Sequence, residues 1–425
     1  MTSERRFEQE LPALLDDLYM GPMPTYRDRL LRQTARTRQR PAWSFLERWL
    51  PMIDIARQPV LAPRLAWRTI GLALVLIALL VAMIAAFVVG SPPQLPAPFG
   101  LARSGLVAYE NGGDLFTVDP VTGDSSPIVS GPETDINPQW SRDGLWVAFE
   151  RKSGADALAG LLFVARPDGS DLTQVTPEAL RPIQSYSFSP DGKEILIAVG
   201  LPEAQRIWIA AADGSGIRQL DVPTPVVGAA WRPPNGSEIL IMDSVGGMYA
   251  MDATSDHVRP ILASSSGLNR SDPQWSPDGS LISFVQWRNA ETLTSETHII
   301  AADGTGDRML PIPPDAVWQA GWTWSNDGTR LLAIRGYTGT FEDSRAAVIP
   351  VDGKGTGVEI EYPGPIQAGC CTTWEWAPDD SSILGTPTND TGAHLDQVLL
   401  DPVAGTFRTV QWASVSRPSW QRRAR

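Results

Sequence analysis

Histidine and cysteine side chains perform much of the metal chemistry in proteins, and this chain uses them sparingly. It has three histidines, His257, His298 and His394, which lie far apart in the sequence. A metal site needs several ligands brought together, so we predict no metal and no bound cofactor. The only cysteines, Cys370 and Cys371, are adjacent and cannot link distant parts of the chain. A strained disulfide, a bridge to another chain and two free thiols all remain open for them.

Carboxylates are plentiful, and their number prevents the sequence from selecting a catalytic pair. Residues 69–425 hold 40 Asp and Glu against 23 Lys and Arg. Glycoside hydrolysis requires two carboxylates a few ångströms apart in a cleft. An enzyme acting on polysaccharide is therefore an alternative without a predicted catalytic residue. The acidic balance argues against nucleic acid as a partner, because duplex binding relies on clustered cations.

Loops between repeated segments of the chain carry the best candidates for a ligand site. Their mixed charges and two aromatic side chains suit a peptide or a glycan. The alternative is a solvated rim in which these side chains bond only to their own loops. The predicted binding residues are Asp135, Arg181, Arg270, Asp272, Trp318, Trp322 and Arg417.

The elements that position these loops are marked by a recurring phrase, Trp-Ser-x-Asp-Gly, followed by an apolar run. Successive copies are 43 to 52 residues apart. A period in the forties, with several short strands in each, predicts an all-β fold, a β-propeller with one blade per repeat. Copies start at Trp140, Phe188, Trp231, Trp275, Trp324 and Trp376, and a bare Trp420 follows.

The conserved letters of the phrase are expected to be structural. Tryptophan is a large wedge between neighbouring blades, and Asp-Gly turns the chain into the next strand. These residues are Trp140, Asp143, Gly144, Asp191, Gly192, Trp231, Trp275, Asp278, Gly279, Trp324, Asp327, Gly328, Trp376 and Trp420.

The two ends of the repeat region predict how the ring closes. The run Leu106–Glu110 resembles the strand that follows each phrase, yet no phrase precedes it. At the other end, Trp420 belongs to an innermost strand that nothing follows. We therefore predict seven blades of four strands, the last one shared between three N-terminal strands and one C-terminal strand. Such closure removes exposed sheet edges.

Three segments precede the repeats. Residues 1–68 carry a net charge of +4, are rich in arginine and contain short amphipathic helical patterns. Residues 69–90 contain no charge in 22 positions and predict a transmembrane helix, because about 20 apolar residues span a bilayer. Arginines on its N-terminal side predict a cytoplasmic N-terminus and an extracytoplasmic propeller over residues 101–425. Residues 91–100 hold four prolines and predict a semi-rigid linker.

The repeats resemble the WD40-like repeats of TolB-type propellers. The likeness covers about residues 101–425 and is most specific in Trp140–Phe149 and Trp275–Phe284. It implies an extracytoplasmic binding scaffold. Similar repeats form the lid of dipeptidyl-peptidase-type hydrolases, whose G-x-S-x-G motif does not occur here, so we predict no such peptidase. The N-terminal layout resembles membrane-bound anti-sigma factors without the His-x-x-x-Cys-x-x-Cys motif that many of them carry.

Three functions fit these observations. The first is a single-pass membrane protein whose propeller binds a protein, peptide or glycan without catalysis. The second is a transmembrane signalling regulator in which the propeller senses and residues 1–68 hold a cytoplasmic protein. The third is a polysaccharide-acting propeller enzyme.

Overall fold

The computed structural model describes residues 74 and 77 and residues 99–424, apart from 153–159, 202–203, 223–225, 256, 265–268, 290–293, 339–343, 361–372, 387–396, 411 and 413–416. The chain divides into two units, Met1–Ser91 and Pro92–Arg425. The predicted segment 1–68, most of the predicted span 69–90, and Cys370, Cys371 and His394 lie outside the described residues. Of the span, residues 74 and 77 are helical. No helix within the described residues is both long and apolar enough to cross a membrane.

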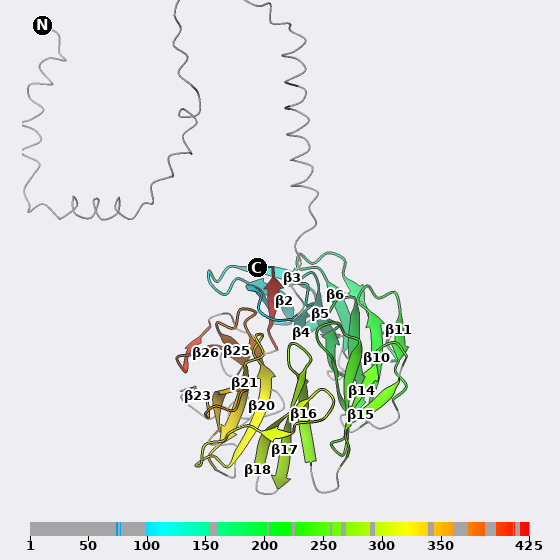
Figure 1. Ribbon diagram of the computed structural model, residues 1–425. Coiled ribbons are helices and arrows are strands. Elements are labelled where there is room, and N and C mark those ends of the chain that lie inside the picture. Colours follow the sequence, from blue (N-terminus) through cyan, green and yellow to red (C-terminus); the bar gives the residue numbers. More distant parts are fainter. Residues whose placement is uncertain are drawn as a thin grey trace, which may run out of the picture. The chain divides into compact units, whose positions relative to one another are not determined.

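The second unit is built from antiparallel sheets that follow one another in chain order, from cyan through green and yellow to red (Figure 1). Four sheets each contain four consecutive strands: β4 (Thr134–Trp140), β5 (Val147–Lys152), β6 (Leu161–Ala165) and β7 (Thr173–Gln174); β16 (Asn269–Trp275), β17 (Leu281–Asn289), β18 (Thr294–Ala301) and β19 (Arg308–Met309); β20 (Trp318–Trp324), β21 (Arg330–Gly336), β22 (Ser344–Pro350) and β23 (Val358–Glu359); and β24 (Thr373–Trp376), β25 (Ile383–Thr386), β26 (Val398–Asp401) and β27 (Thr406–Thr409).

An eight-stranded sheet contains two further runs of four strands. They are β8 (Ile183–Phe188), β9 (Glu194–Leu201), β10 (Ala204–Ala211) and β11 (Ile217–Gln219), then β12 (Val226–Trp231), β13 (Glu238–Asp243), β14 (Met248–Asp252) and β15 (Val258–Leu262). A single residue pair, Gln205 with Val226, joins the two runs.

The remaining sheet joins the two ends of the unit in the order β28 (Ser419–Arg423), β1 (Arg103–Asn111), β2 (Asp114–Val118) and β3 (Ser125–Val129). Val107 pairs with Trp420, and Ala108 pairs with Ser419. The C-terminal strand therefore completes a sheet begun by the first three strands, as the two unmatched strands of the sequence predict. Figure 1 shows the C-terminal strand in red close to the labels of β2 and β3, the outer strands of the sheet that it joins through β1.

Apolar side chains fill the space between successive sheets. One buried cluster joins Val107 of β1 to Leu384 of β25, Leu399 of β26 and Trp420 of β28. Because neighbouring sheets cover both faces of each sheet, the strands after the phrases are continuous apolar runs, such as Ile195–Val199 within β9.

Hydrogen bonds explain the Ser-x-Asp-Gly part of the phrase. The Ser141 hydroxyl donates to Asp143 over 2.6 Å and accepts from the main-chain N–H of Trp146 over 2.9 Å. The Asp143 carboxylate also accepts from the N–H of Leu145. Ser189, Ser276 and Ser325 repeat both hydroxyl bonds in their own copies. Each phrase therefore closes a turn that starts the following strand.

The tryptophans of the phrase lie buried between neighbouring strand groups. The indole N–H of Trp231 donates to the carbonyl of Ser187, and that of Trp324 donates to the Ser283 hydroxyl over 2.9 Å. Each acceptor belongs to the preceding group of four strands. Trp231 and Trp324 thus fix the spacing of adjacent groups by both volume and a hydrogen bond. Trp140, Trp275 and Trp420 act through volume, since their indole nitrogens find no hydrogen-bond partner in the described part of the chain.

Asp380 stands where other copies have glycine, in the copy that starts at Trp376, and it has a structural role there. It has φ = +58°, and its carboxylate accepts from the main-chain N–H groups of Asn326 over 2.7 Å and Asp327 over 2.9 Å. Burial raises the pKa of this carboxyl. Asp380 therefore clamps the neighbouring phrase instead of marking a weakened repeat.

We expect Gly279→Ala to destabilise the fold by about 2 kcal/mol or more, because the glycine has φ = +69° and an added Cβ would lie 2.0 Å from the carbonyl oxygen of Pro233. Urea unfolding followed by tryptophan fluorescence measures the loss. Gly123→Ala is the matched control, since Gly123 also has a positive φ but nothing within 4 Å of an added Cβ. Equal losses for the two variants would show that the contact with Pro233 does not restrict this position.

Candidate functional site

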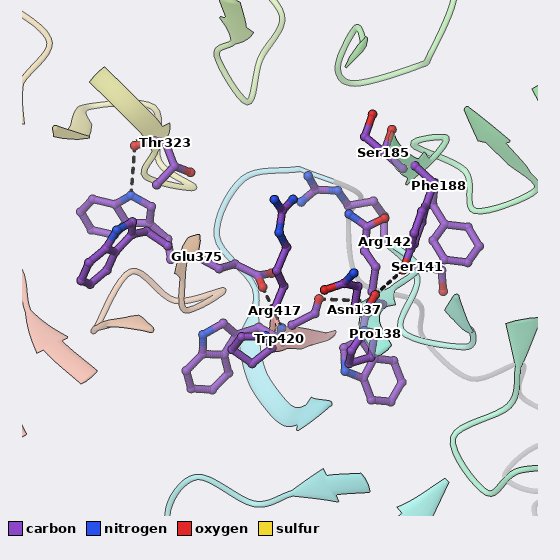
Figure 2. A pocket seen from close by; sticks show the side chains of 18 of the residues that line it. Asn137, Pro138, Ser141, Arg142, Ser185, Phe188, Thr323, Glu375, Arg417 and Trp420 are labelled. Carbon is purple, nitrogen blue, oxygen red and sulfur yellow. Dashed lines mark hydrogen bonds between the residues drawn. The ribbon is translucent and has the colours of Figure 1, made fainter. Parts of the chain in front are cut away.

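The innermost strands surround a central cavity of about 880 Å³. Its walls come largely from β4, β8, β16, β20, β24 and β28 and the residues beside them. Figure 2 labels wall residues from all of these strands except β16. The phrases that end these six inner strands therefore supply much of the cavity wall, whereas no residue of β12 lines it.

In six of the seven copies, the residue before the aromatic residue that starts the phrase faces this cavity, and the exception is Ala230, which packs against a core cluster. Side chains alternate between the two sides of a strand, so a tryptophan wedged between sheets directs its predecessor toward the centre. Glu375 carries the only charge at these positions. The residues of this kind that line the cavity are Gln139, Ser187, Gln274, Thr323, Glu375 and Ser419.

The second residue after the tryptophan supplies the other polar groups. In four copies this residue is proline, and in the other three it is Arg142, Asn326 or Arg422. All three polar residues line the cavity. Arg422 also binds across it, donating to the Asn326 side chain over 2.7 Å and to the carbonyl of Gly100.

Glu375 is partly buried in the wall of the cavity. Its carboxylate accepts a hydrogen bond from the main-chain N–H of Trp420 over 3.2 Å. Burial raises the pKa of Glu375 to about 7, although the positive charge of Arg142 opposes the rise. This carboxyl therefore changes its charge near neutral pH, and it does so close to Arg142 and Arg422.

The arginines are affected by the same enclosure. Burial lowers the pKa of Arg142, with Glu375 opposing the effect. Burial, followed by repulsion from Arg142, lowers the pKa of Arg422 to about 10. The Arg142 guanidinium lies over the ring of Phe99, 4.6 Å from its centroid. A partly buried cation, Arg142, and a buried one, Arg422, thus lie close together on the cavity wall.

A second polar group lies on the wall formed by β4, β5 and β8. Glu150 is 8% exposed, and burial raises the pKa of its carboxyl. Nearby, burial raises the pKa of Tyr186, whose hydroxyl donates to the carbonyl of Asn137. Asn137 has φ = +56° at a bulge in β4, which turns its carbonyl toward the tyrosine.

Among the predicted binding residues, Arg417 lies on the cavity wall and is exposed (Figure 2). Three others are buried in structural contacts. Asp135 accepts two hydrogen bonds of 2.8 Å from Arg151. Arg270 donates to the carbonyls of Gly246 and Ala263 and lies over Phe284, and Trp318 is fully buried in the core between two sheets.

Of the last three predicted residues, Arg181 and Asp272 are not among the residues that line this cavity. Arg181 precedes Pro182 through a cis peptide bond. Asp272 is exposed, with φ = +53° at a bulge in β16. Trp322 belongs to β20, and its side chain is outside the described part. A ligand at the loops leading into the inner strands stays a prediction for these residues.

Sequence reasoning missed most of the cavity because it searched the loops before the inner strands. The signal was present in the phrase itself, where Arg142 and Asn326 replace the usual proline and Glu375 stands among neutral residues.

Metal ligation finds no support in the described residues, among which no group of three or more His, Cys, Asp and Glu side chains could hold an ion. His298 instead binds Asp307 through its Nδ1 over 2.8 Å and stacks on Phe284.

No protein-family model matches the chain. It is 25% identical over 174 residues to "Uncharacterized peptidase YuxL" of Bacillus subtilis (strain 168), and 26% identical over 166 residues to Tol-Pal system protein TolB of Francisella tularensis subsp. mediasiatica (strain FSC147). The matches cover 40% and 38% of this chain. They span only 24% and 37% of the length of these curated relatives.

Solved structures resemble the chain at lower identity. Prolyl endopeptidase has a TM-score of 0.54 at 14% identity, with 75% of this chain and 51% of that chain covered. Oligogalacturonate lyase in complex with manganese has a TM-score of 0.52 at 12% identity, with 69% and 84% covered. At these identities the likeness shows the fold alone. Together with the sequence likeness to TolB, it supports a TolB-type β-propeller.

The raised pKa of Glu375 predicts a pH-dependent stability. Its folded pKa of about 7 exceeds the ordinary value of 4.5, so the folded state binds the proton more tightly than the unfolded state. The resulting stabilisation is complete below about pH 4.5 and is lost as the pH rises through 7. We therefore expect Glu375→Gln to gain stability relative to the natural protein by about 1–3 kcal/mol between pH 5 and pH 8.

Urea unfolding at a series of pH values measures this difference. Glu178→Gln changes an exposed carboxylate outside the cavity lining and serves as the control. A constant difference between Glu375→Gln and the natural protein over this range would contradict a protonation of Glu375 near neutral pH.

Proposed function

We propose that this chain is a single-pass membrane protein whose extracytoplasmic propeller is a non-catalytic binding scaffold for a protein, peptide or glycan. The observation that carries the proposal is the central cavity, which is lined by inner strands and holds charged side chains in fixed hydrogen bonds. A site of about 880 Å³ suits a small ligand or a short segment of a larger one.

The scaffold in this proposal has seven blades. Support comes from the four sheets of four consecutive strands, the sheet that joins β28 to β1–β3, and the eight-stranded sheet. The last divides naturally into two blades, because only the pair Gln205 and Val226 connects its halves.

Membrane anchoring rests on the sequence. Residues 69–90 contain 22 uncharged positions, which about matches the length that a bilayer requires. Arg57, Arg64 and Arg68 precede them, so the positive-inside rule assigns residues 1–68 to the cytoplasm. The linker of residues 91–100 would then hold the propeller outside the membrane.

A second candidate function is transmembrane signalling. The net charge of +4 in residues 1–68 and the apolar spacing of Phe7, Leu11, Leu14 and Leu18 favour an amphipathic helix that binds a cytoplasmic protein. Affinity capture with residues 1–68 tests this function. Recovery of a specific cytoplasmic partner supports it, and recovery of none would count strongly against it.

Photo-crosslinking in native membranes tests the scaffold. A photoreactive amino acid in place of Gln274 or Thr323 lies on the cavity wall, whereas the same residue in place of Val403 lies on an outer turn that is 76% exposed. We expect one dominant adduct at both cavity positions and none of that kind at position 403. Adducts of equal yield and identity at all three positions would rule out the cavity as the binding site.

A further inference from the structure

Arg142 is an unusually placed cation. Within the described residues, its contacts are a ring contact with Phe99 and electrostatic interactions with Glu375 and Arg422, and no hydrogen bond is among them. Stacking on Phe99 covers one face of the guanidinium and leaves its N–H groups directed outward from its edge. Figure 2 shows Arg142, Glu375 and Arg417 around the same space. A partly buried guanidinium that makes no hydrogen bond to any described residue adds little to stability, which points to a use other than packing.

The cavity is positive within a negatively charged chain. Among the described residues, the side chains that line it include four cations, Arg142, Lys152, Arg417 and Arg422, and two carboxyls, Glu150 and Glu375. Burial raises the pKa of both carboxyls, which reduces their negative charge further. The complete chain has a net charge of −13. An anion is therefore favoured in this cavity and disfavoured over much of the remaining surface.

We propose that Arg142 and Arg422 form a carboxylate-binding site and that the cavity holds an acidic segment of a peptide or protein. This inference rests on the proposed function and names its ligand class. A guanidinium matches a carboxylate by two parallel hydrogen bonds, and enclosure in the cavity strengthens them.

Both arginines already contact a short segment of this chain in the way that they would contact a bound peptide. Arg142 covers the ring of Phe99, and Arg422 donates to the carbonyl of the next residue, Gly100. The two guanidinium groups therefore already hold a side chain and a main-chain carbonyl of one short segment. Proline rings also line the wall, at Pro138 and Pro277 among others, and they suit the apolar parts of a peptide.

Glu375 makes binding depend on pH. The groups that interact with it are Arg142 from the β4–β5 turn, the Ser419 hydroxyl, the Trp420 N–H and Arg422 from β28. When Glu375 loses its proton, it competes with a ligand carboxylate for the two arginines. Affinity should therefore rise as the pH falls through about 7, where peptide carboxylates remain ionised.

A tetrapeptide library tests the proposal. One half contains a single Asp or Glu in each peptide, and the matched half contains Asn or Gln in the same place. The full-length protein in detergent is expected to retain the acidic half about tenfold more strongly than the amide half, and Arg142→Gln should abolish this preference. Arg408→Gln removes an exposed arginine of β27 and should leave the preference unchanged.

Stability separates a binding role of Arg142 from a structural one. Because Arg142 makes no hydrogen bond within the described residues, Arg142→Gln should melt at the same temperature as the natural protein or higher. A lower melting temperature together with lost binding would overturn the proposal, since the arginine would then be structural.

The pH arm compares retention at pH 5.5 and pH 8. The natural protein should bind acidic peptides about three- to tenfold better at pH 5.5, and Glu375→Gln should bind equally at both values.

Equal retention of acidic and amide peptides, with cavity crosslinks intact, would overturn the carboxylate site but leave the scaffold. Retention of oligogalacturonate and not of acidic peptides would assign the ligand to the glycans and overturn the peptide. Loss of cavity crosslinks as well would end both proposals.

Discussion

The pairing of β28 with β1 is the constraint on which the rest of this structure depends. It joins Trp420 to Val107 and Ser419 to Ala108, so the last strand of the chain becomes the inner strand of the first sheet. Without it, β1 and the sheet of β24–β27 would each expose an unpaired surface. The same pairing carries Arg422 and the N–H of Trp420 to the cavity, where they meet Asn326 and Glu375.

Closure and the proposed site therefore share their residues. The Ser419 hydroxyl accepts from the N–H of Trp140, which ties the last strand to β4, and Gln421 donates to the carbonyl of Gly144. These bonds stabilise the ring. Arg142 and Glu375 lie beside them, and burial disfavours the charged form of each. Strong closure by neighbouring residues offers a physical reason why the fold tolerates this local cost.

Departures from the repeated phrase have two different meanings in this molecule. Asp380 replaces a glycine and binds the neighbouring phrase through Asn326 and Asp327, so this change is structural. Arg142 replaces a proline and makes no hydrogen bond in the described part of the chain, so this change is free to serve a ligand. The difference depends on what each side chain contacts, and a repeat alignment alone does not reveal it.

The sequence by itself determined the all-β propeller, the strand after each phrase and the pairing of the two chain ends. These features can be read along the chain, because apolar runs and Asp-Gly turns act over a few residues and their repetition every 43 to 52 residues marks each unit. Among the predicted binding residues, Arg417 lies on the cavity wall, whereas Asp135 and Arg270 form hydrogen bonds within the fold. Only the tertiary structure decided which polar side chains meet, since Arg422 and Asn326 are 96 residues apart and become neighbours through ring closure.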